Sequence, residues 1–200
     1  MSGAFFVLLV AYIMGSFPMG LWVGQVFFKK DIRVEGSSNI GATNAYRILG
    51  PSAGVVVFLG DFLKGAAPVI IMKSINLEPN LINWLAVGAG MFAMLGHTFS
   101  IFLKFKGGKG VTTALGAIIV LAPKVSALIL LIWLVVLAIS RYISLSSITA
   151  ALALPVFTIF WQGQNTPFMI FSFLIAIVII YKHRSNIGRL FEGVEPRVGS

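Results

Sequence analysis

Long apolar runs, separated by short polar segments, make up most of the chain. The runs cover residues 4–28, 52–73, 81–103, 111–140, 144–161 and 166–182. A helix that crosses a bilayer needs roughly 20 apolar residues, and every run approaches or exceeds that length. The pattern therefore predicts an all-α integral membrane protein. Pro18 lies inside the first run and predicts a kink there.

The run 111–140 is long for one span and short for two, and Pro123-Lys124 interrupts it. If it crosses twice, every Lys and Arg except Lys64, Lys73 and Lys124 lies on one side of the membrane. The positive-inside rule selects that arrangement. We therefore predict a compact bundle of about seven transmembrane helices, with the N-terminus outside and the C-terminus cytoplasmic. The helix that follows Gly110 must then be short.

Composition agrees with a membrane protein. Of the 200 residues, 58% are hydrophobic and only 10% are charged, and the mean hydropathy is +0.97; soluble domains carry about 25% charged residues. We expect one transmembrane domain over residues 1–200, with cytoplasmic loops at about 29–51, 104–110 and 182–200. The net charge of +9 suits such loops and does not predict nucleic-acid binding. The chain has no cysteine, which excludes thiol nucleophiles and disulfides.

The segment from Gly96 to Gly110 combines glycines with three lysines. Glycine lets the backbone approach a ligand closely, so that consecutive N–H groups can converge on an anion. The lysines add positive charge, and a helix that starts after Gly110 could point its N-terminus at the same anion. The residues concerned are Lys104, Lys106, Gly107, Gly108 and Lys109. Lysines beside a span are also ordinary topology determinants, and the glycines could simply form a turn.

Two further polar segments fall on the same predicted side. Residues 36–47 offer hydroxyls, amides and one guanidinium, and a helix cap at Thr43 and Asn44 followed by Arg47 would suit a phosphate. Residues 181–195 combine His183, Arg184 and Asn186 with further basic side chains. The first could be an ordinary polar loop and the second a basic flank of the last span. Together with the lysine segment they favour a site for an anionic substrate.

Three motifs also match a known family. They are Gly36-Ser-Ser-Asn-Ile-Gly-Ala-Thr-Asn44, then Gly96-His-Thr-Phe-Ser100 with Phe105-Lys-Gly-Gly-Lys-Gly110, and finally Lys182-His-Arg-Ser-Asn-Ile-x-Arg189 with Gly193-x-Glu195. This set resembles the motifs of the bacterial acyl-phosphate:glycerol-3-phosphate acyltransferases, the PlsY family, in order and over essentially the whole chain. Ser38 departs from the pattern, because many members carry glycine there.

The resemblance implies that a fatty acyl group is transferred from acyl phosphate to glycerol 3-phosphate. The products would be 1-acyl-glycerol 3-phosphate (lysophosphatidate) and inorganic phosphate, in the first membrane step of phospholipid biosynthesis. It implies a multi-pass protein of the bacterial cytoplasmic (inner) membrane with its site on the cytoplasmic side. We expect a monomer without cofactor or metal, and a soluble enzyme that makes acyl phosphate is a candidate partner.

The residues agree with that chemistry. Both substrates carry phosphate, and an acyl phosphate is already activated, so no strong nucleophile is required. The His-x4-Asp pair of soluble-type glycerolipid acyltransferases is missing. Catalysis by positioning and electrostatics is therefore predicted. The catalytic candidates are Ser37, Arg47, His97, Lys106, His183 and Asn186. The candidates for binding substrate or phosphate are Ser38, Asn39, Gly41, Thr43, Asn44, Ser100, Lys104, Gly107, Gly108, Lys109 and Arg184.

Two points stay open at this stage. The base that takes the substrate's hydroxyl proton could be His97, His183 or a phosphate oxygen of the donor. The phosphate is favoured because neither histidine has an obvious carboxylate to orient it; Glu35 and Asp61 are the carboxylates expected near the site. Asp61 and Lys64 share one face of a span, either as a functional pair or by mutual neutralisation.

Two rival functions fit less well. A transporter of phosphate or of a phosphorylated metabolite would also use lysines in a bundle, but the chain shows no internal repeat and no polar gate on the opposite side. A phosphatidyl-alcohol transferase needs several closely spaced aspartates for metal, and the chain has only Asp31 and Asp61. The acyl chain should lie in an apolar groove between helices that opens to the bilayer.

Overall fold

The computed structural model describes residues 2–163 and 165–199, and within these ranges every regular element is a helix. The chain divides into two compact units, residues 1–120 (unit 1) and 121–200 (unit 2). Each unit is described by itself below. The predicted all-α class is confirmed for the described residues.

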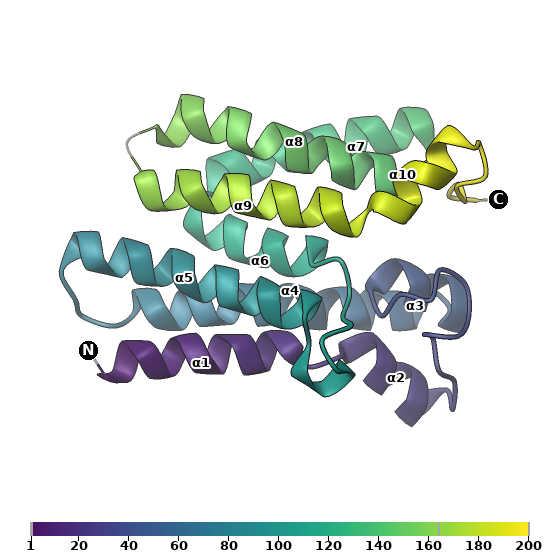
Figure 1. Cartoon of the computed structure of the whole chain (residues 1–200), viewed down its shortest axis with the longest axis horizontal. Helices are drawn as coiled ribbons and strands as arrows, with labels where there is room; N and C mark the ends of the chain where they lie inside the picture. Colours follow the sequence, from purple (N-terminus) through teal and green to yellow (C-terminus); the bar gives the residue numbers. More distant parts are fainter. Residues whose placement is uncertain (1, 164, 200) are drawn as a thin grey trace. The chain divides into compact units, whose positions relative to one another are not determined.

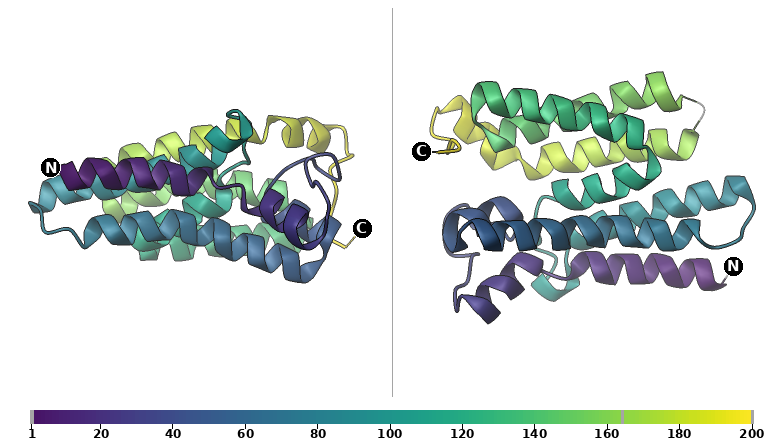
Figure 2. Two further views of the ribbon diagram at one scale, coloured as in Figure 1. Left: turned by 90° about the horizontal axis from the view of Figure 1, so that it is seen from below. Right: turned by 180° about the vertical axis from the view of Figure 1, so that it is seen from behind.

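Unit 1 is a bundle built around three long helices. Its elements are α1 (Ser2–Ser16), α2 (Met19–Phe27), α3 (Ala42–Leu49), α4 (Pro51–Lys73), α5 (Pro79–Thr98), the 3₁₀ turn η1 (Ile101–Leu103) and α6 (Val111–Leu121), of which only the last residue falls in unit 2. Helices α1, α4 and α5 pack against one another, and α3 packs on α4. The views of Figure 2 show α1 and α4 running side by side.

Glycines allow the helices of unit 1 to pack closely. Gly15 of α1 lies against the backbone of Ala93 in α5, and Gly96 of α5 lies against the backbone of Tyr12. Gly65 of α4 meets the carbonyl of Thr113 in α6 in the same way. A Cβ at any of these three positions would collide with backbone. Contact through small residues is how membrane helices gain packing energy without a hydrophobic driving force between them.

The first apolar run is broken where the sequence predicts. Helix α1 ends at Ser16, α2 begins at Met19, and the two axes differ by 46°. Pro18 has no backbone N–H and cannot continue the hydrogen-bond ladder. At the break the carbonyl of Phe17 accepts the N–H of Met19 (3.0 Å). Side chains from elsewhere in unit 1 also bond the carbonyls of Ser16 and Phe17, as the site below shows.

Unit 2 is a helical hairpin extended by two further helices. It contains α7 (Pro123–Ser140), α8 (Ile143–Gln162), α9 (Thr166–Lys182) and α10 (Arg184–Phe191). Helix α8 packs against both α7 and α9, and α10 packs against the ends of α8 and α9. The axes of α9 and α10 differ by 56°. The segment after α10 returns to the α7–α8 turn, where Val198 N–H donates to the Arg141 carbonyl (2.8 Å).

Four described helices are long and apolar enough to span a membrane, and up to six spans result if each bent pair counts as one. The run 111–140 does break, at Ala122, and the helix after Gly110 is short: α6 has 11 residues. In Figure 1 the α2–α3 connection lies at one end of unit 1 and the α4–α5 turn at the other, while the α5–α6 connection lies between them, beside the break from α1 to α2. The count of seven spans and the orientation stay predictions.

Candidate active site

The loop between α2 and α3 is organised by one buried amide. Asn44 is 1% exposed, and its Nδ2 donates to the carbonyls of Ile32 (2.8 Å) and Glu35 (3.2 Å). Its Oδ1 accepts from the N–H of Ser37 (2.9 Å). Three hydrogen bonds from one side chain hold the loop in place. They also leave the amide little capacity to bind a ligand.

The predicted cap at Thr43 and Asn44 is wrong. Helix α3 begins at Ala42, its N-cap is Gly41, and no side chain caps it. The N–H of Gly41 is bonded to Asn39 Oδ1 (3.0 Å). Asn39, Gly41 and Asn44 are therefore engaged in shaping the loop, while Thr43 is half-buried near the helix start.

The loop and the helix that follows it leave two hydroxyls and a guanidinium accessible. Ser37 and Ser38 of the loop are exposed, and Ser38 has φ +54°. Arg47 of α3 is exposed one turn after Thr43. Hydroxyls and a guanidinium are groups chemically suited to bind a phosphate. All three belong to a segment whose backbone is already hydrogen-bonded.

The glycine pair of the lysine segment does not form the predicted anion-binding nest. The N–H of Gly107 donates to the carbonyl of Thr98 (3.2 Å), and that of Gly108 donates to the carbonyl of His97 (3.0 Å). Both amides therefore satisfy carbonyls at the end of α5, which lack helical partners. The prediction that these two amides converge on an anion is wrong.

The glycines instead bring the lysine segment onto α5 and leave its charges outside. A Cβ on Gly108 would collide with Nε2 of His97, so only glycine allows the backbone to lie on that ring. Lys104 and Lys106 are exposed, and Lys109 is half-buried. The turn requires positive φ at Lys104 and Phe105 (51° and 62°). The segment is therefore a folded loop that presents ammonium groups.

A buried ionic cluster lies behind the lysine segment. Lys64 Nζ is 2.8 Å from Asp61 Oδ1, so the pair predicted from the spacing in α4 is formed. The same oxygen lies 3.6 Å from Nδ1 of His97. All three side chains are less than 10% exposed. His97 therefore does have a carboxylate beside it, contrary to the prediction that neither histidine has one.

Two hydroxyls tie the end of α5 to α1. Ser100 Oγ donates to the carbonyl of Ser16 (2.5 Å), and Tyr12 Oη donates to the carbonyl of Phe99 (2.8 Å). Lys64 Nζ donates to the carbonyl of Phe17 (2.9 Å). Ser100 is fully buried, so the hydroxyl that was predicted to bind substrate serves in this junction.

The third motif forms its own cluster in unit 2. Asn186 is buried, and its Nδ2 donates to Glu195 Oε1 (2.6 Å), while Arg189 Nε donates to Oε2 (2.7 Å). His183 is 3% exposed, and its Nδ1 lies 2.8 Å from the Ile179 carbonyl. A carbonyl only accepts, so Nδ1 carries the proton and Nε2 is an acceptor in the neutral ring.

Arg184 of the third motif points elsewhere. It is exposed and lies over the ring of Tyr181, 4.7 Å from the centroid. This contact is a cation–π interaction at the end of α9. Arg184 is thus outside the Asn186–Glu195 cluster and remains accessible at the surface of unit 2.

Glu195 is a structural residue that the sequence reasoning overlooked as a carboxylate of the site. Burial raises the pKa of Glu195, but the neighbouring side chains of Ser144, Asn186 and Arg189 lower it more, so its pKa lies below the usual range. The carboxylate is therefore ionised at neutral pH and accepts from both motif side chains. The signal available in the sequence was its place in the third motif.

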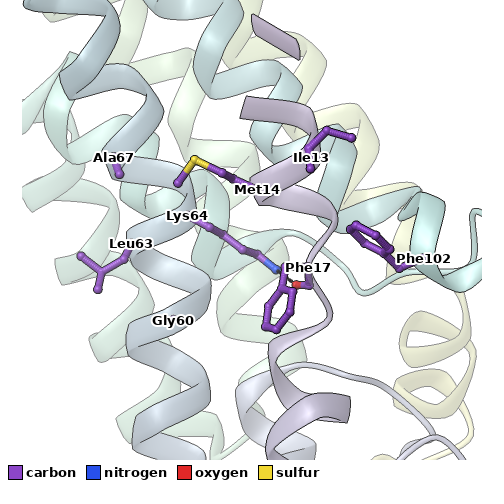
Figure 3. Close-up of a pocket in the computed structure, with 8 residues that line it drawn as sticks. All are labelled: Ile13, Met14, Phe17, Gly60, Leu63, Lys64, Ala67 and Phe102. Carbon is purple, nitrogen blue, oxygen red and sulfur yellow. Dashed lines mark hydrogen bonds between the residues drawn. The ribbon is translucent and has the colours of Figure 1, made fainter. Parts of the chain in front are cut away.

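An apolar groove of about 470 Å³ lies between α1 and α4 in unit 1 (Figure 3). Its walls are formed by Ile13 and Met14 of α1, by Phe17 just after that helix, and by Gly60, Leu63 and Ala67 of α4. Phe102 of η1 lies beside it, and Lys64 contributes its methylenes. Because Lys64 Nζ is directed to the Phe17 carbonyl, the groove itself is apolar. Its volume falls in the range of about 300–1,000 Å³ that is usual for ligand sites.

Comparison with known proteins identifies the chain. The family model described as glycerol-3-phosphate acyltransferase matches residues 5–193. The chain belongs to this family. The chain is 45% identical to the glycerol-3-phosphate acyltransferase of Fusobacterium nucleatum subsp. nucleatum over 96% of this chain and 97% of the relative. It is 42% identical to that of Geobacillus kaustophilus over 96% and 94%.

Solved structures of the acyltransferase family share this fold. One is a crystal structure of PlsY, described as an integral membrane glycerol 3-phosphate acyltransferase, in its glycerol 3-phosphate form. It superposes with a TM-score of 0.90 at 40% identity, covering 98% of this chain and 96% of that one. The lysophosphatidic acid form of PlsY gives a TM-score of 0.86 at the same identity and coverage. An integral membrane acyltransferase is therefore the class of this chain.

Proposed function

We propose that this acyltransferase takes its acyl group from acyl phosphate and transfers it to glycerol 3-phosphate, giving lysophosphatidate and inorganic phosphate. The observation that carries the proposal is the full-length match to a protein solved with glycerol 3-phosphate and with lysophosphatidic acid. The exposed cations on ordered loops, above all Arg47 and Lys106, suit two phosphate-bearing substrates.

The reaction requires positioning more than chemical activation. The primary hydroxyl of glycerol 3-phosphate attacks the acyl carbonyl carbon, an ester C–O bond forms, and the C–O bond to phosphate breaks. The proton of the hydroxyl passes to the departing phosphate, so no covalent enzyme intermediate is needed. Ser37, Arg47, Lys106 and Lys109 hold the phosphates and stabilise the charge that develops on them.

A phosphate oxygen of the donor remains our proposed base. His97 is enclosed by Asp61 on one side and Gly108 on the other, which suits support of the loop. His183 is the protein group to test against the phosphate, because its Nδ1–H is bonded to a carbonyl and its Nε2 is an acceptor. A His183→Gln variant that keeps more than a tenth of the activity would exclude it as an essential base.

The apolar groove between α1 and α4 is proposed to hold the acyl chain. It is lined by aliphatic and aromatic side chains, and it lies in helices that belong to candidate membrane spans. Ala67 is a small residue in its wall, so that a larger side chain there would take up part of the groove. Ala67→Phe should therefore shift the preference toward shorter acyl phosphates, measured as the ratio of kcat/KM for C12 and C16 donors. An unchanged ratio would place the chain elsewhere.

The proposed topology is seven spans with α6 as the short one, the N-terminus outside and the site on the cytoplasmic side of a bacterial inner membrane. In unit 1 the basic segments precede α3, include Arg47 within it and follow α5, and in unit 2 they follow α7 and α9. Lys73 and Lys124 are at the opposite helix ends. The single transmembrane domain, the monomeric state and a soluble supplier of acyl phosphate are part of the same proposal.

The decisive experiment follows both products of the purified protein in lipid. Palmitoyl phosphate and glycerol 3-phosphate are supplied, and phosphate and lysophosphatidate are measured beside a palmitoyl-CoA control. Lys106→Ala should raise the KM for a phosphate-bearing substrate and so lower turnover, whereas Lys73→Ala, at the last residue of α4, should not. Turnover with palmitoyl-CoA but not with palmitoyl phosphate as the acyl donor would overturn the donor assignment. Uptake of glycerol 3-phosphate into liposomes without acyl transfer would support the transporter instead.

A further inference from the structure

Asp61 and Lys64 have no role in the mechanism proposed above, yet they are a buried ion pair within the apolar helix α4. Asp61 is 2% exposed and Lys64 is 7% exposed. Taking two charges out of water is unfavourable, and apolar side chains of the same size often replace such a pair without loss of stability. A charged pair at this depth of a membrane helix therefore points to a task beyond packing.

The contacts of the pair lead to the lysine segment. Asp61 Oδ1 lies 3.6 Å from Nδ1 of His97, which is the penultimate residue of α5. The opposite side of the same ring supports Gly108, and the carbonyl of His97 accepts the Gly108 N–H (3.0 Å). Gly108 lies between Lys106 and Lys109. A continuous set of contacts thus joins the ion pair to the two lysines that carry the positive charge.

Lys64 adds a second connection. Its Nζ bonds both Asp61 and the carbonyl of Phe17, a residue of the break between α1 and α2. The ion pair thereby joins α4 to that break, while His97 belongs to α5. The side chain of His97 lies between Asp61 of α4 and the backbone of Gly108. A ring with so little freedom is a rigid support for the loop that rests on it.

We propose that Asp61 and Lys64 are positioning residues. Asp61 orients the His97 ring, the ring fixes Gly108, and Gly108 sets the place of Lys106 and Lys109 against a substrate phosphate. Neither Asp61 nor Lys64 touches substrate. The inference rests on the proposed function only in that Lys106 and Lys109 bind a phosphate of the reaction.

The test is the double variant Asp61→Asn/Lys64→Met, which removes both charges together and leaves neither unpaired. It should keep a melting temperature near that of the parent. The double variant should raise KM by about ten- to a hundredfold, and for the same substrate whose KM is raised by Lys106→Ala. Small displacements of positioning groups have effects of this size. Its kcat should change less. The matched control is Asp31→Asn/Arg33→Met, an exposed pair of the same unit, which should leave KM and kcat unchanged.

A second variant tests the path. Gly108→Ala places a methyl group against the His97 ring and should raise the same KM. Combined with the Asp61/Lys64 double variant it should add little, because both act on one contact. Effects that multiply would show independent roles and overturn the proposal, as would parental KM values in a folded Asp61/Lys64 variant.

Two further outcomes can be told apart: a double variant that does not fold, and a parent protein without acyl-phosphate turnover. If the double variant does not fold, Asp61→Glu keeps the charge but displaces the carboxylate from His97, and a parental KM for it overturns the proposal. If the parent protein shows no turnover with acyl phosphate, the donor assignment fails; binding of glycerol 3-phosphate by calorimetry then still compares parent and variants.

Discussion

Two loops of the molecule are each built around a buried asparagine, but the partners of the two amides differ. In unit 1, Asn44 bonds three backbone groups of residues 32–37. In unit 2, Asn186 bonds the carboxylate of Glu195, which Arg189 also binds. The Asn44 side chain holds the first loop through neutral backbone groups alone, whereas the Asn186 side chain depends on one ionised carboxylate.

The difference shows two ways in which a buried amide can hold a loop. Neutral amide bonds hold their geometry at any ordinary pH and place no charge beside the anionic ligand. A buried carboxylate gives stronger hydrogen bonds, but it must remain ionised and it introduces negative charge. In unit 1 the exposed groups, Ser37 and Arg47, can therefore meet a phosphate without a competing anion on the Asn44 side chain.

The largest expected effect concerns the guanidinium that the Asn44 loop presents. Arg47→Ala should reduce kcat/KM by about 10²–10³, the usual result of removing one charge-stabilising donor, and leave the melting temperature within a few degrees. Arg33→Ala, at an exposed arginine of the loop before α3 that pairs with Asp31, should keep kcat/KM within about twofold. An equal loss of kcat/KM in both variants would show that activity depends on the net charge of the protein and not on the position of Arg47.

The next effect concerns the amide of Asn44 and a second amide of the same loop, that of Asn39. Asn44→Ala leaves two carbonyls and one N–H without their partner and should destabilise unit 1 by about 3 kcal/mol. Asn39→Ala removes a single half-buried bond to Gly41 and should lower stability by about 1 kcal/mol or less. Thermal unfolding in detergent measures both. A larger loss in Asn39→Ala would mean that Asn44 is not the centre of the loop.

An acid titration separates the loops. Since the pKa of Glu195 is lowered in the folded protein, its contribution is fully present above the ordinary carboxyl pKa of about 4.3. That contribution is lost as the pH falls through the lower folded value. Glu195→Gln should be less stable at pH 7 by about 2 kcal/mol, and the gap should narrow toward pH 3. An unchanged gap would show that Glu195 acts by shape alone.

The smallest effect is expected at the exposed pair beside the Asn44 loop. The hydrogen bond from Arg33 lowers the pKa of Asp31, and Arg33 Nη2 lies 2.6 Å from Oδ2. Both side chains are solvated, so Asp31→Asn should change stability by about 0.5 kcal/mol or less. Melting curves at low and high salt check this. A loss as large as that of Glu195→Gln would contradict the distinction between exposed and buried carboxylates.

Much of the fold is encoded locally. The lengths of the apolar runs, Pro18 and Pro123 predict the helices, the bend after α1 and the short α6, because helix length and proline geometry depend on neighbouring residues only. The basic loops are visible for the same reason, as lysines next to glycines. The cap of α3 was predicted at the wrong residues because the Asn44 side chain does not cap the helix. It donates instead to carbonyls twelve and nine residues earlier in the chain.

The sequence by itself determined the membrane class, the family and the three basic loops, since apolar length, charge and motif order are properties of the chain. Only the tertiary structure decided what the polar side chains bind. The N–H groups of Gly107 and Gly108 donate to carbonyls at the end of α5. Asp61 lies beside His97, and Glu195 accepts a hydrogen bond from Asn186. A hydrogen bond depends on which groups folding brings within about 3 Å, and those groups lie on different helices or beyond the end of one.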